Sequence, residues 1–180
     1  MVYFTADLHY KHDKEFIWKK RGFSSMEEHD EKLLYELNNL TELDTLYILG
    51  DVSFGKDALK NSIELLSTLR CMTYVIRGNH DKKLFNVKPK MGLVRFVDSH
   101  LLEETICGQK MVLSHYPLVS WHQSHYGSWH IHGHVHGQKL PIVGKMLDVA
   151  PTAEFFGPYS FYDVEKKMKE LPDNWDLVEK

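Results

Sequence analysis

The chain has 180 residues, of which 43% are hydrophobic and 26% are charged, and its formal net charge is −3 at pH 7. A chain of this length and composition can bury a continuous core, and we expect one domain over residues 1–180. The slight negative charge excludes the basic surface typical of proteins that bind duplex nucleic acid, so extended duplexes are not expected partners.

The first residues and the cysteines indicate the cellular compartment. The segment that begins at Met1 has no basic leader, and no stretch approaches the roughly 18 apolar residues of a membrane-spanning helix. Cys71 and Cys107 lie far apart without CxxC spacing, so we expect neither a disulfide framework nor a thiolate zinc site. Both are interpreted as reduced core residues. These features predict a cytoplasmic protein that does not enter a membrane.

Three short β-favouring runs in the first half of the chain each end in polar residues. These predicted strands cover residues 2–6, 45–49 and 73–76. A capping box at Ser25-Met26-Glu27-Glu28 starts an apolar stripe that reaches Leu40, and a second stripe runs from Ala58 to Leu69. Alternating strands and helices predict parallel pairing with right-handed crossovers, and ligands then collect beyond the carboxyl ends of the strands.

The second half of the chain changes character. Predicted strands cover residues 94–97, 101–107 and 110–113. A tight turn at Gly108-Gln109 joins the last two, so a second, more antiparallel sheet is expected. The long irregular segment 116–129 is rich in aromatic residues and histidine, and loops of this length are usually functional. Short strands near Ile131 and at 146–149 follow it. A final helix over 163–171 is predicted to be capped by Ser160 or Asp163.

Asp7 and His9 follow the first predicted strand, two residues apart. In an extended segment both side chains point to one side and can reach one cation. Gly50-Asp51 follows the second strand. The two oxygens of this carboxylate can each bind a different metal ion.

A polar block, Gly78-Asn79-His80-Asp81, follows the third strand. Glycine lets the backbone turn sharply, Asn79 offers a neutral carbonyl ligand, and His80 offers a titratable group. Each of the three blocks alone also fits a solvated turn or a helix cap. Their repetition at the ends of three strands favours a metal site.

Histidine is the compositional outlier, with 12 residues, of which seven lie between positions 115 and 136. His115 ends a predicted strand, and Tyr116-Pro117 follows it. In the segment from His130 to His136 an imidazole recurs at every second position, so these side chains can share one face. A histidine-rich surface loop is the alternative to metal binding there. Three histidines match no motif and are expected at the surface: His12, His29 and His100.

Taken in order, the blocks D-x-H, G-D, G-N-H-D, H and G-H-x-H resemble the calcineurin-like metallophosphoesterase superfamily, over residues 3 to about 137. The stretches that look like a small bacterial and phage phosphoesterase subgroup are Tyr3–His9, Ile48–Asp51, Leu113–Pro117 and Gly127–His136. The resemblance implies an α/β fold, a four-layer α/β/β/α sandwich of two mixed β-sheets flanked by helices. The segment Leu147–Thr152 departs from the polar Asn-x-Gly-Ser strand of many members, which weakens any inference about substrate.

The resemblance also implies a dinuclear metal site. One ion would be held by Asp7, His9, Asp51 and His136, and the other by Asp51, Asn79, His115 and His134. Asp51 is then the bridge. Oxygen and nitrogen ligands without thiolate suit Mn²⁺, Fe, Zn²⁺, Ni²⁺ or Co²⁺ better than Ca²⁺, and manganese is the expected metal.

The implied activity is hydrolysis of phosphomonoester or phosphodiester bonds by a metal-bridging hydroxide, with His80 as general acid. Asp81 is assigned as a second catalytic group that orients the His80 ring. The expected substrate contacts are Asn79, His80 and His125, the last from the aromatic loop. Anchoring of the tryptophans of that loop on the core is the alternative. The expected substrate is a phosphate ester, either a small molecule or a nucleotide.

Two other functions fit parts of the pattern. A non-catalytic scaffold of the same fold would be expected to have lost ligands, whereas this chain keeps all seven together with His80. A different zinc metallohydrolase is suggested by His132-Gly133-His134-Val135-His136, which resembles part of the metallo-β-lactamase motif but lacks its Asp-His pair. Monoesterase, diesterase, cyclic nucleotide hydrolase and nuclease activities stay open, and the charge favours a small or short substrate.

Overall fold

A computed structural model describes residues 1–141 and 144–177 of the chain. Its first sheet has the strand order β4-β3-β2-β1-β9, in which only β9 runs antiparallel to its neighbour. The strands are β1 (Val2–Thr5), β2 (Thr45–Ile48), β3 (Met72–Ile76), β4 (Val94–Val97) and β9 (Tyr159–Ser160). The three predicted strands of the first half are therefore confirmed as parallel neighbours, and their carboxyl ends meet at one edge of the sheet.

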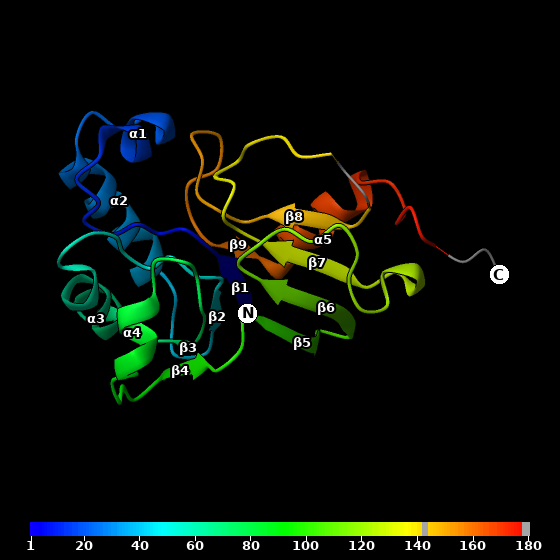
Figure 1. Cartoon of the computed structure of the whole chain (residues 1–180), viewed down its shortest axis with the longest axis horizontal. Helices are drawn as coiled ribbons and strands as arrows, with labels where there is room; N and C mark the ends of the chain where they lie inside the picture. The colour runs from blue at the N-terminus through cyan, green and yellow to red at the C-terminus, as the bar shows by residue number, and fades with distance from the viewer. Residues whose placement is uncertain (142–143, 178–180) are drawn as a thin grey trace.

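Helices lie on the side of this sheet that faces away from the second sheet (Figure 1). They are α1 (Glu15–Trp18), the 3₁₀ turn η1 (Lys19–Arg21), α2 (Met26–Asn38), α3 (Ala58–Thr68) and α4 (Lys82–Val87). Leu33, Leu65 and Leu84 of the last three helices pack with the sheet in one buried cluster. Ser25 caps α2 by accepting the N–H of Glu28 at 3.1 Å, as predicted. None of the helices in the described part of the chain is long and apolar enough to cross a membrane.

The second sheet has the strand order β5-β6-β7-β8. Its strands are β5 (Leu101–Ile106), β6 (Gln109–Ser114), β7 (Trp129–His132) and β8 (Met146–Asp148). β5 and β6 form an antiparallel hairpin, whereas β6, β7 and β8 are parallel. The sheet is therefore mixed and less antiparallel than predicted. The parallel pairing brings the carboxyl ends of β6 and β7 to the same edge.

The space between the two sheets holds a second apolar cluster. Phe4 and Leu49 contribute from the first sheet, and Leu113 and Ile131 from the second. Helix α5 (Phe161–Glu170) packs Val164 against the same cluster and lies beside β8 and β9 (Figure 1). The α/β class with two mixed sheets is thus confirmed.

The outer face of the second sheet differs from the predicted four-layer arrangement. Val112 and Met146 on that face are covered by Trp121, which belongs to the irregular segment after β6. The helix of this segment in the described structure is the single turn η2 (Ser124–Tyr126). Because α5 packs on the core between the sheets, a loop takes the place of the fourth helical layer.

Four local predictions also differ from the structure. β4 pairs with β3 in the first sheet, and not with the strands that follow it. The hairpin turn is Cys107-Gly108, where both residues have left-handed φ values of 50° and 83°. Cys107 is consequently exposed, whereas Cys71 is buried as expected. Helix α5 begins at Phe161, and Ser160 with Asp163 forms its capping box.

Candidate metal centre

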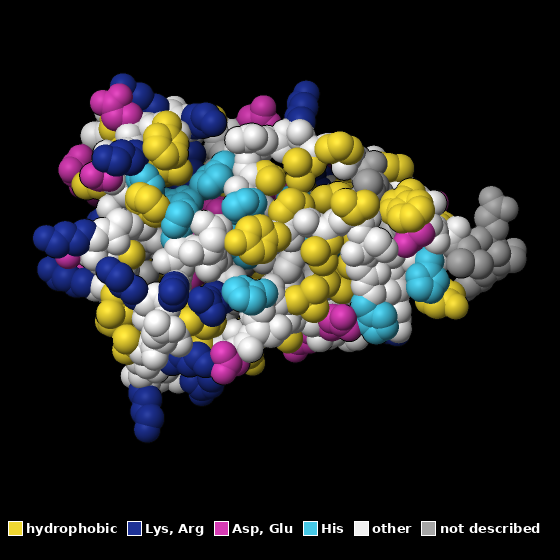
Figure 2. All heavy atoms as spheres, in the orientation of Figure 1, with side chains coloured by type: hydrophobic (Ala, Val, Ile, Leu, Met, Phe, Trp, Pro, Cys, Tyr) yellow, Lys and Arg dark blue, Asp and Glu magenta, His cyan; other side chains and the backbone are white. Residues whose placement is uncertain are grey.

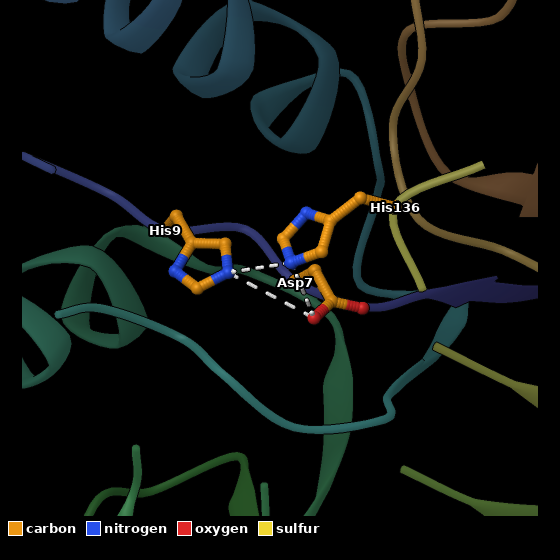
Figure 3. A group of neighbouring side chains, drawn as sticks. All are labelled: Asp7, His9 and His136. Carbon is orange, nitrogen blue, oxygen red and sulfur yellow. Dashed lines mark hydrogen bonds and ion pairs between the residues drawn. The ribbon is translucent and has the colours of Figure 1, made fainter. Parts of the chain in front are cut away.

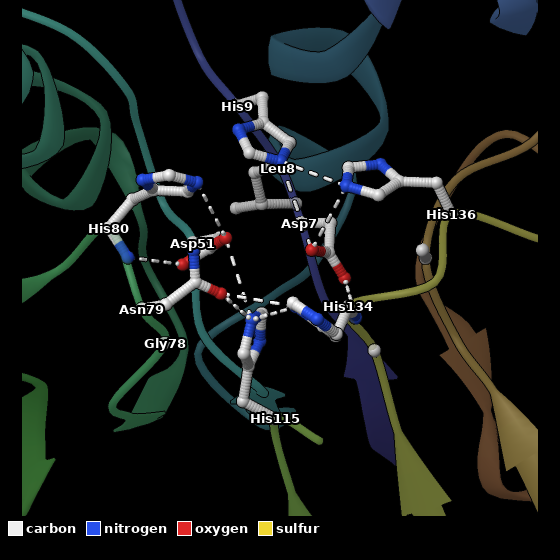
Figure 4. A network of polar contacts seen from close by, with 12 residues as sticks. Asp7, Leu8, His9, Asp51, Gly78, Asn79, His80, His115, His134 and His136 are labelled. Atoms are coloured by element: carbon white, nitrogen blue, oxygen red, sulfur yellow. Dashed lines mark hydrogen bonds and ion pairs between the residues drawn. The ribbon is translucent and has the colours of Figure 1, made fainter. Parts of the chain in front are cut away.

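Seven side chains come together where β1, β2, β3, β6 and β7 end (Figure 4). Each belongs to the loop that directly follows one of these strands. They are the residues that the sequence predicted as ligands: Asp7, His9, Asp51, Asn79, His115, His134 and His136. In the space-filling view, histidine side chains gather near the middle of the visible face, and lysine and arginine side chains lie mainly to the left of them, on the helical side (Figure 2).

The backbone at these positions is unusual. Five of the seven residues have left-handed φ values between 49° and 72°: Asp7, His9, Asp51, His134 and His136. Non-glycine residues rarely adopt this conformation, although aspartate and histidine tolerate it better than most. Each instance costs about 1 to 3 kcal/mol and persists only where the surrounding structure holds it. Such strain concentrated in the ligand loops is typical of a functional site.

Asp7, His9 and His136 form the first triad (Figure 3). Asp7 Oδ1 lies 3.8 Å from His9 Nε2 and 3.6 Å from His136 Nε2, and the two imidazole nitrogens are 3.4 Å apart. The other carboxylate oxygen, Oδ2, accepts the N–H of His134 at 2.7 Å. Oδ1 is buried without a hydrogen-bond partner in the described structure. A cation among these three groups would satisfy that oxygen.

A second triad joins Asp7, Asp51 and His115, whose ligand atoms lie within 4.8 Å of one another. His115 Nε2 lies 3.5 Å from Asp51 Oδ2 and 2.8 Å from Asn79 Oδ1. His134 Nδ1 lies 3.1 Å from the same Asn79 oxygen and 3.2 Å from His115 Nε2. The carboxylate shared by the two triads is Asp7, whereas the bridging role predicted for Asp51 stays a prediction.

The electrostatics of the triads suit a cation. Burial raises the pKa of Asp7 well above its usual value and also raises that of Asp51. Burial lowers the pKa of His9, and it lowers those of His115 and His136 to about 4. The imidazoles are therefore neutral at physiological pH, the form that binds metals. The neutral imidazoles give the buried carboxylates no compensating charge, and this donor set fits a divalent metal ion.

Glycines allow the loops to approach so closely. A Cβ atom at Gly78 would lie 2.2 Å from Asp51 Oδ1, and one at Gly133 would lie 2.3 Å from Asp7 Oδ2. At Gly50 a Cβ would meet the backbone of Gly78 at 2.6 Å. No other residue fits these positions without moving a ligand.

Asp81 has a different partner from the one predicted. Its carboxylate accepts the backbone N–H groups of Gly78 at 2.9 Å, Asp51 at 2.7 Å and Val52 at 3.1 Å. Both oxygens are thus engaged by the backbone, and the predicted orientation of the His80 ring by Asp81 is wrong. Asp81 instead ties the loop after β3 to the loop after β2.

His80 lies at the rim of the centre. Its backbone N–H donates to Asp51 Oδ1 at 2.9 Å, and its ring Nε2 lies 3.8 Å from Asp51 Oδ2. The side chain is 36% exposed and meets the Phe54 ring edge-on at 4.5 Å between centroids. The imidazole is therefore held beside the carboxylates while it remains open to solvent.

The structure does not bring His125 to this group. His125 lies in η2, ahead of the first residue of β7, whereas the ligand histidines follow the last residue of that strand. The assignment of His125 as a substrate contact is therefore wrong. In the same loop the buried Trp121 donates its indole N–H to Ser128 O at 3.0 Å. The tryptophan anchors the loop, in agreement with the alternative interpretation.

Two histidines predicted at the surface are buried. His12 stacks on Phe54 at 4.4 Å between centroids, and His29 accepts or donates hydrogen bonds on both ring nitrogens. Arg21, which the sequence did not single out, is also buried and donates to the main chain beside Asp7. No local pattern marks these three residues, because their partners lie on other elements. His100 is exposed as predicted.

A cavity of about 140 Å³ opens beside His136. Part of its lining comes from α1 and η1. The rest comes from His136, from Gln138 and from the residues that follow β8. The lining residues are Phe16, Ile17, Lys20, Arg21, His136, Gln138, Pro151 and Thr152. The lining combines apolar groups with cations and has no carboxylate, so it is suited to an organic group attached to an anion.

Comparisons with known proteins find one similar sequence and two similar structures. No model of a known protein family matches it. The uncharacterized protein MJ1445 of Methanocaldococcus jannaschii is 33% identical over 140 residues, which are 77% of this chain and 71% of that protein.

The structure is similar to that of a protein of unknown function, AQ665 from Aquifex aeolicus, with a TM-score of 0.70 and 22% identity over 93% of this chain and 98% of that one. These two chains share a fold. YfcE, a phosphoesterase from E. coli, matches at a TM-score of 0.44 and 19% identity, over 84% of this chain and 79% of that one. A likeness at that level carries no argument.

Proposed function

The chain belongs to the same family as the uncharacterized protein MJ1445, whose name supplies no activity, and we propose from the geometry of the site that it is a metal-dependent phosphoesterase. The proposal includes membership of the calcineurin-like metallophosphoesterases, on the order of the ligand blocks along the chain. The observation that carries it is the buried Asp7 Oδ1, which has no hydrogen-bond partner among the described residues and lies within 3.8 Å of two imidazole nitrogens.

The proposed cofactor is a pair of divalent ions, with Mn²⁺ the first to test. Asp7, His9 and His136 would hold one ion, and Asp51, Asn79, His115 and His134 would surround the other. Asp7 and Asp51 lie close enough to share in both sites. When bound, such ions supply a water of lowered pKa and neutralise the phosphoryl oxygens.

The residues of the chain supply the remaining steps. Asn79, at the mouth of the site, is proposed to bind a phosphoryl oxygen through its side-chain amide. His80 is proposed to hold a proton on its ring and to deliver it to the leaving oxygen. The hydrogen bond from its backbone to Asp51, together with Phe54, keeps the ring at the rim where a leaving group would depart.

The proposed substrate is a small phosphate ester or a nucleotide. The chain has no excess of basic residues for an extended nucleic acid. The cavity beside His136 has room for a small organic group. Lys20 lines the same cavity, and its positive charge is close enough to contribute to the lowered pKa of His136. The choice between a monoester and a diester is left to the experiment.

The test is hydrolysis by protein reconstituted with Mn²⁺, and then with Zn²⁺ or Co²⁺, on p-nitrophenyl phosphate, on bis-p-nitrophenyl phosphate and on nucleotides. We expect metal-dependent turnover that falls by about 100-fold or more in His80→Ala, since general acid catalysis is worth that much. His100→Ala, at an exposed histidine outside the site, is the matched control.

Two outcomes would contradict the proposal. Protein that binds metal but cleaves none of these esters would favour the non-catalytic scaffold. Unchanged turnover in both Asn79→Ala and His80→Ala would favour another class of metallohydrolase, because only the phosphoesterase proposal gives both residues a role.

A further inference from the structure

The segment from Asp7 to Lys11 carries two of the ligands in a strained backbone. Asp7, His9 and Lys11 have left-handed φ values of 50°, 49° and 56°. On one side of the segment, the N–H groups of Asp7 and His9 donate to the loop after β2, to Gly50 O at 2.9 Å and to Asp51 O at 3.1 Å. These bonds fix the N–H side only, so the carbonyl groups need partners elsewhere.

Arg21 supplies those partners from the opposite side. Its guanidinium, at the end of η1, is buried, with 5% of the residue exposed. Nη2 donates to Asp7 O at 2.6 Å, and Nη1 donates to Leu8 O at 3.2 Å. The backbone of the ligand segment is thus clamped between a neighbouring loop and a buried cation.

His29 and Asp30 of α2 complete the arrangement. Arg21 Nη1 also donates to His29 Nε2 at 2.9 Å. Because arginine only donates, the ring proton of His29 lies on Nδ1, which donates to Asp30 Oδ1 at 2.8 Å. Asp30 Oδ2 accepts the backbone N–H of Lys11 at 3.0 Å, which returns the chain of bonds to the ligand segment.

We propose that Arg21, His29 and Asp30 form a positioning network that sets the geometry and the metal affinity of the triad of Asp7, His9 and His136. The network forms hydrogen bonds with main-chain atoms of the ligand segment at Asp7, Leu8 and Lys11. It rests on the metal site of the proposed function, and it does not depend on which ester is cleaved.

The charge of Arg21 and its hydrogen bonds affect metal affinity in opposite directions. A fixed cation near Asp7 repels a metal ion, so its removal alone would strengthen metal binding. Loss of its two hydrogen bonds to main-chain carbonyl groups would leave these groups unpaired and release the ligand segment, which would weaken metal binding. The hydrogen bonds dominate in our proposal, because the donors reach the carbonyl groups of two successive peptides, Asp7–Leu8 and Leu8–His9.

The first test is a titration of the metal-free protein with Co²⁺, in which the visible absorption of the bound Co²⁺ is measured. We expect Arg21→Met to bind Co²⁺ about 10- to 100-fold more weakly, the loss typical when a group that orients metal ligands is removed. Its absorption bands should shift, and Arg21→Lys should restore part of the affinity. The matched control is Arg70→Met, which removes a remote, exposed bond to Asn38 O. Unchanged or tighter binding by folded Arg21→Met would overturn the proposal.

The second test needs no metal. Amide hydrogen exchange at residues 7–11 should accelerate in metal-free Arg21→Met, while exchange in β2 stays at the wild-type rate. If Arg21→Met does not fold, Asp30→Asn takes its place, with faster exchange expected at Lys11. Equal exchange in variant and wild type would overturn the network even if the wild type binds Co²⁺. A wild type that binds no Co²⁺ would instead overturn the metal centre and with it the proposed function.

Discussion

Asp7 is the residue on which most of the candidate site depends. Its side chain is fully buried beyond the end of β1, and it belongs to both triads. Its Oδ2 accepts the N–H of His134, and the backbone of Gly133 lies so close to this oxygen that an added Cβ would collide with it. A carboxylate so confined can be displaced by a single added methyl group.

Gly133→Ala provides that test. The new Cβ would lie 2.3 Å from Asp7 Oδ2 and 2.4 Å from the Cβ of Ala6, so the carboxylate or the loop must move. We expect loss of metal binding in an isothermal titration, and destabilisation of about 1 to 3 kcal/mol from overpacking. Gly92→Ala is the matched control, because a methyl group added there would meet no atom of the described residues within 4 Å. Wild-type metal affinity in Gly133→Ala would contradict the described geometry.

Asp81→Asn tests the three-way contact of the Asp81 carboxylate. Asparagine keeps one acceptor oxygen but turns an amide group toward backbone N–H donors, so at least one bond is lost. We expect the free energy of unfolding to fall by about 2 kcal/mol, measured by urea denaturation. Asp57→Asn changes an exposed carboxylate that makes no capping bond in the structure described, and it should have little effect. Equal stability of the two variants would show that the carboxylate is dispensable.

Among the helices and strands, those with a longer apolar pattern in the sequence were predicted more accurately. β1, β2, α2 and α3 have apolar runs or stripes with caps, and the sequence located them to within a few residues. α1, α4 and β9 were not predicted, because each has at most six residues and is stabilised by its neighbours. β4 was placed in the wrong sheet, since an apolar run does not specify its pairing partner.

Helix α5 offers a test that is independent of the site. Ser160 accepts the N–H of Asp163 at 3.1 Å, and Asp163 accepts that of Ser160 at 2.9 Å. Ser160→Ala should lower the free energy of unfolding by about 1 kcal/mol, the usual worth of an N-cap. Metal affinity should be unchanged, because α5 packs on the core between the sheets. A change in metal affinity without a change in stability would contradict this separation.

At the scale of the whole molecule, buried histidines couple stability to pH. His130 donates from Nδ1 to Val112 O at 3.0 Å and accepts the N–H of Leu118 on Nε2 at 3.1 Å. It is fully buried, and burial together with the neighbouring His132 lowers its pKa to about 4. The folded protein therefore holds this ring neutral, whereas the unfolded chain takes up a proton below about pH 6.5.

This difference in protonation makes the folded protein less stable as the pH falls. Between about pH 6.5 and pH 4 the unfolded state binds the extra proton, so the contribution of His130 to stability is complete above that window and is lost as pH falls. From pH 7 to pH 5 the metal-free protein should lose about 2 kcal/mol through His130 alone. We expect His130→Asn, although less stable at pH 7, to show a smaller loss by urea denaturation. An equal loss would contradict the assignment.

The sequence by itself determined the chemistry of the site. Strands that end in carboxylate, amide and imidazole groups must bring them together if the strands are parallel, because parallel carboxyl ends share an edge. This reasoning reached Asp7, Asp51 and Asn79 without structural information, whereas the ligand role of His115 followed from the resemblance of the ordered motifs. The sequence also showed Gly50 and Gly78 beside two of these residues, although it could not tell how closely the loops after β2 and β3 approach each other.

Only the tertiary structure decided which partner each group has. Asp81 contacts the backbone of another loop, Arg21 and His29 support the Asp7 segment, and His125 lies at the far end of β7. These contacts join residues that belong to separate elements, and they depend on left-handed backbone angles that no hydrophobic period encodes. Local patterns report how a segment folds on its own, whereas a site assembled from five strand ends is defined by the packing of the two sheets.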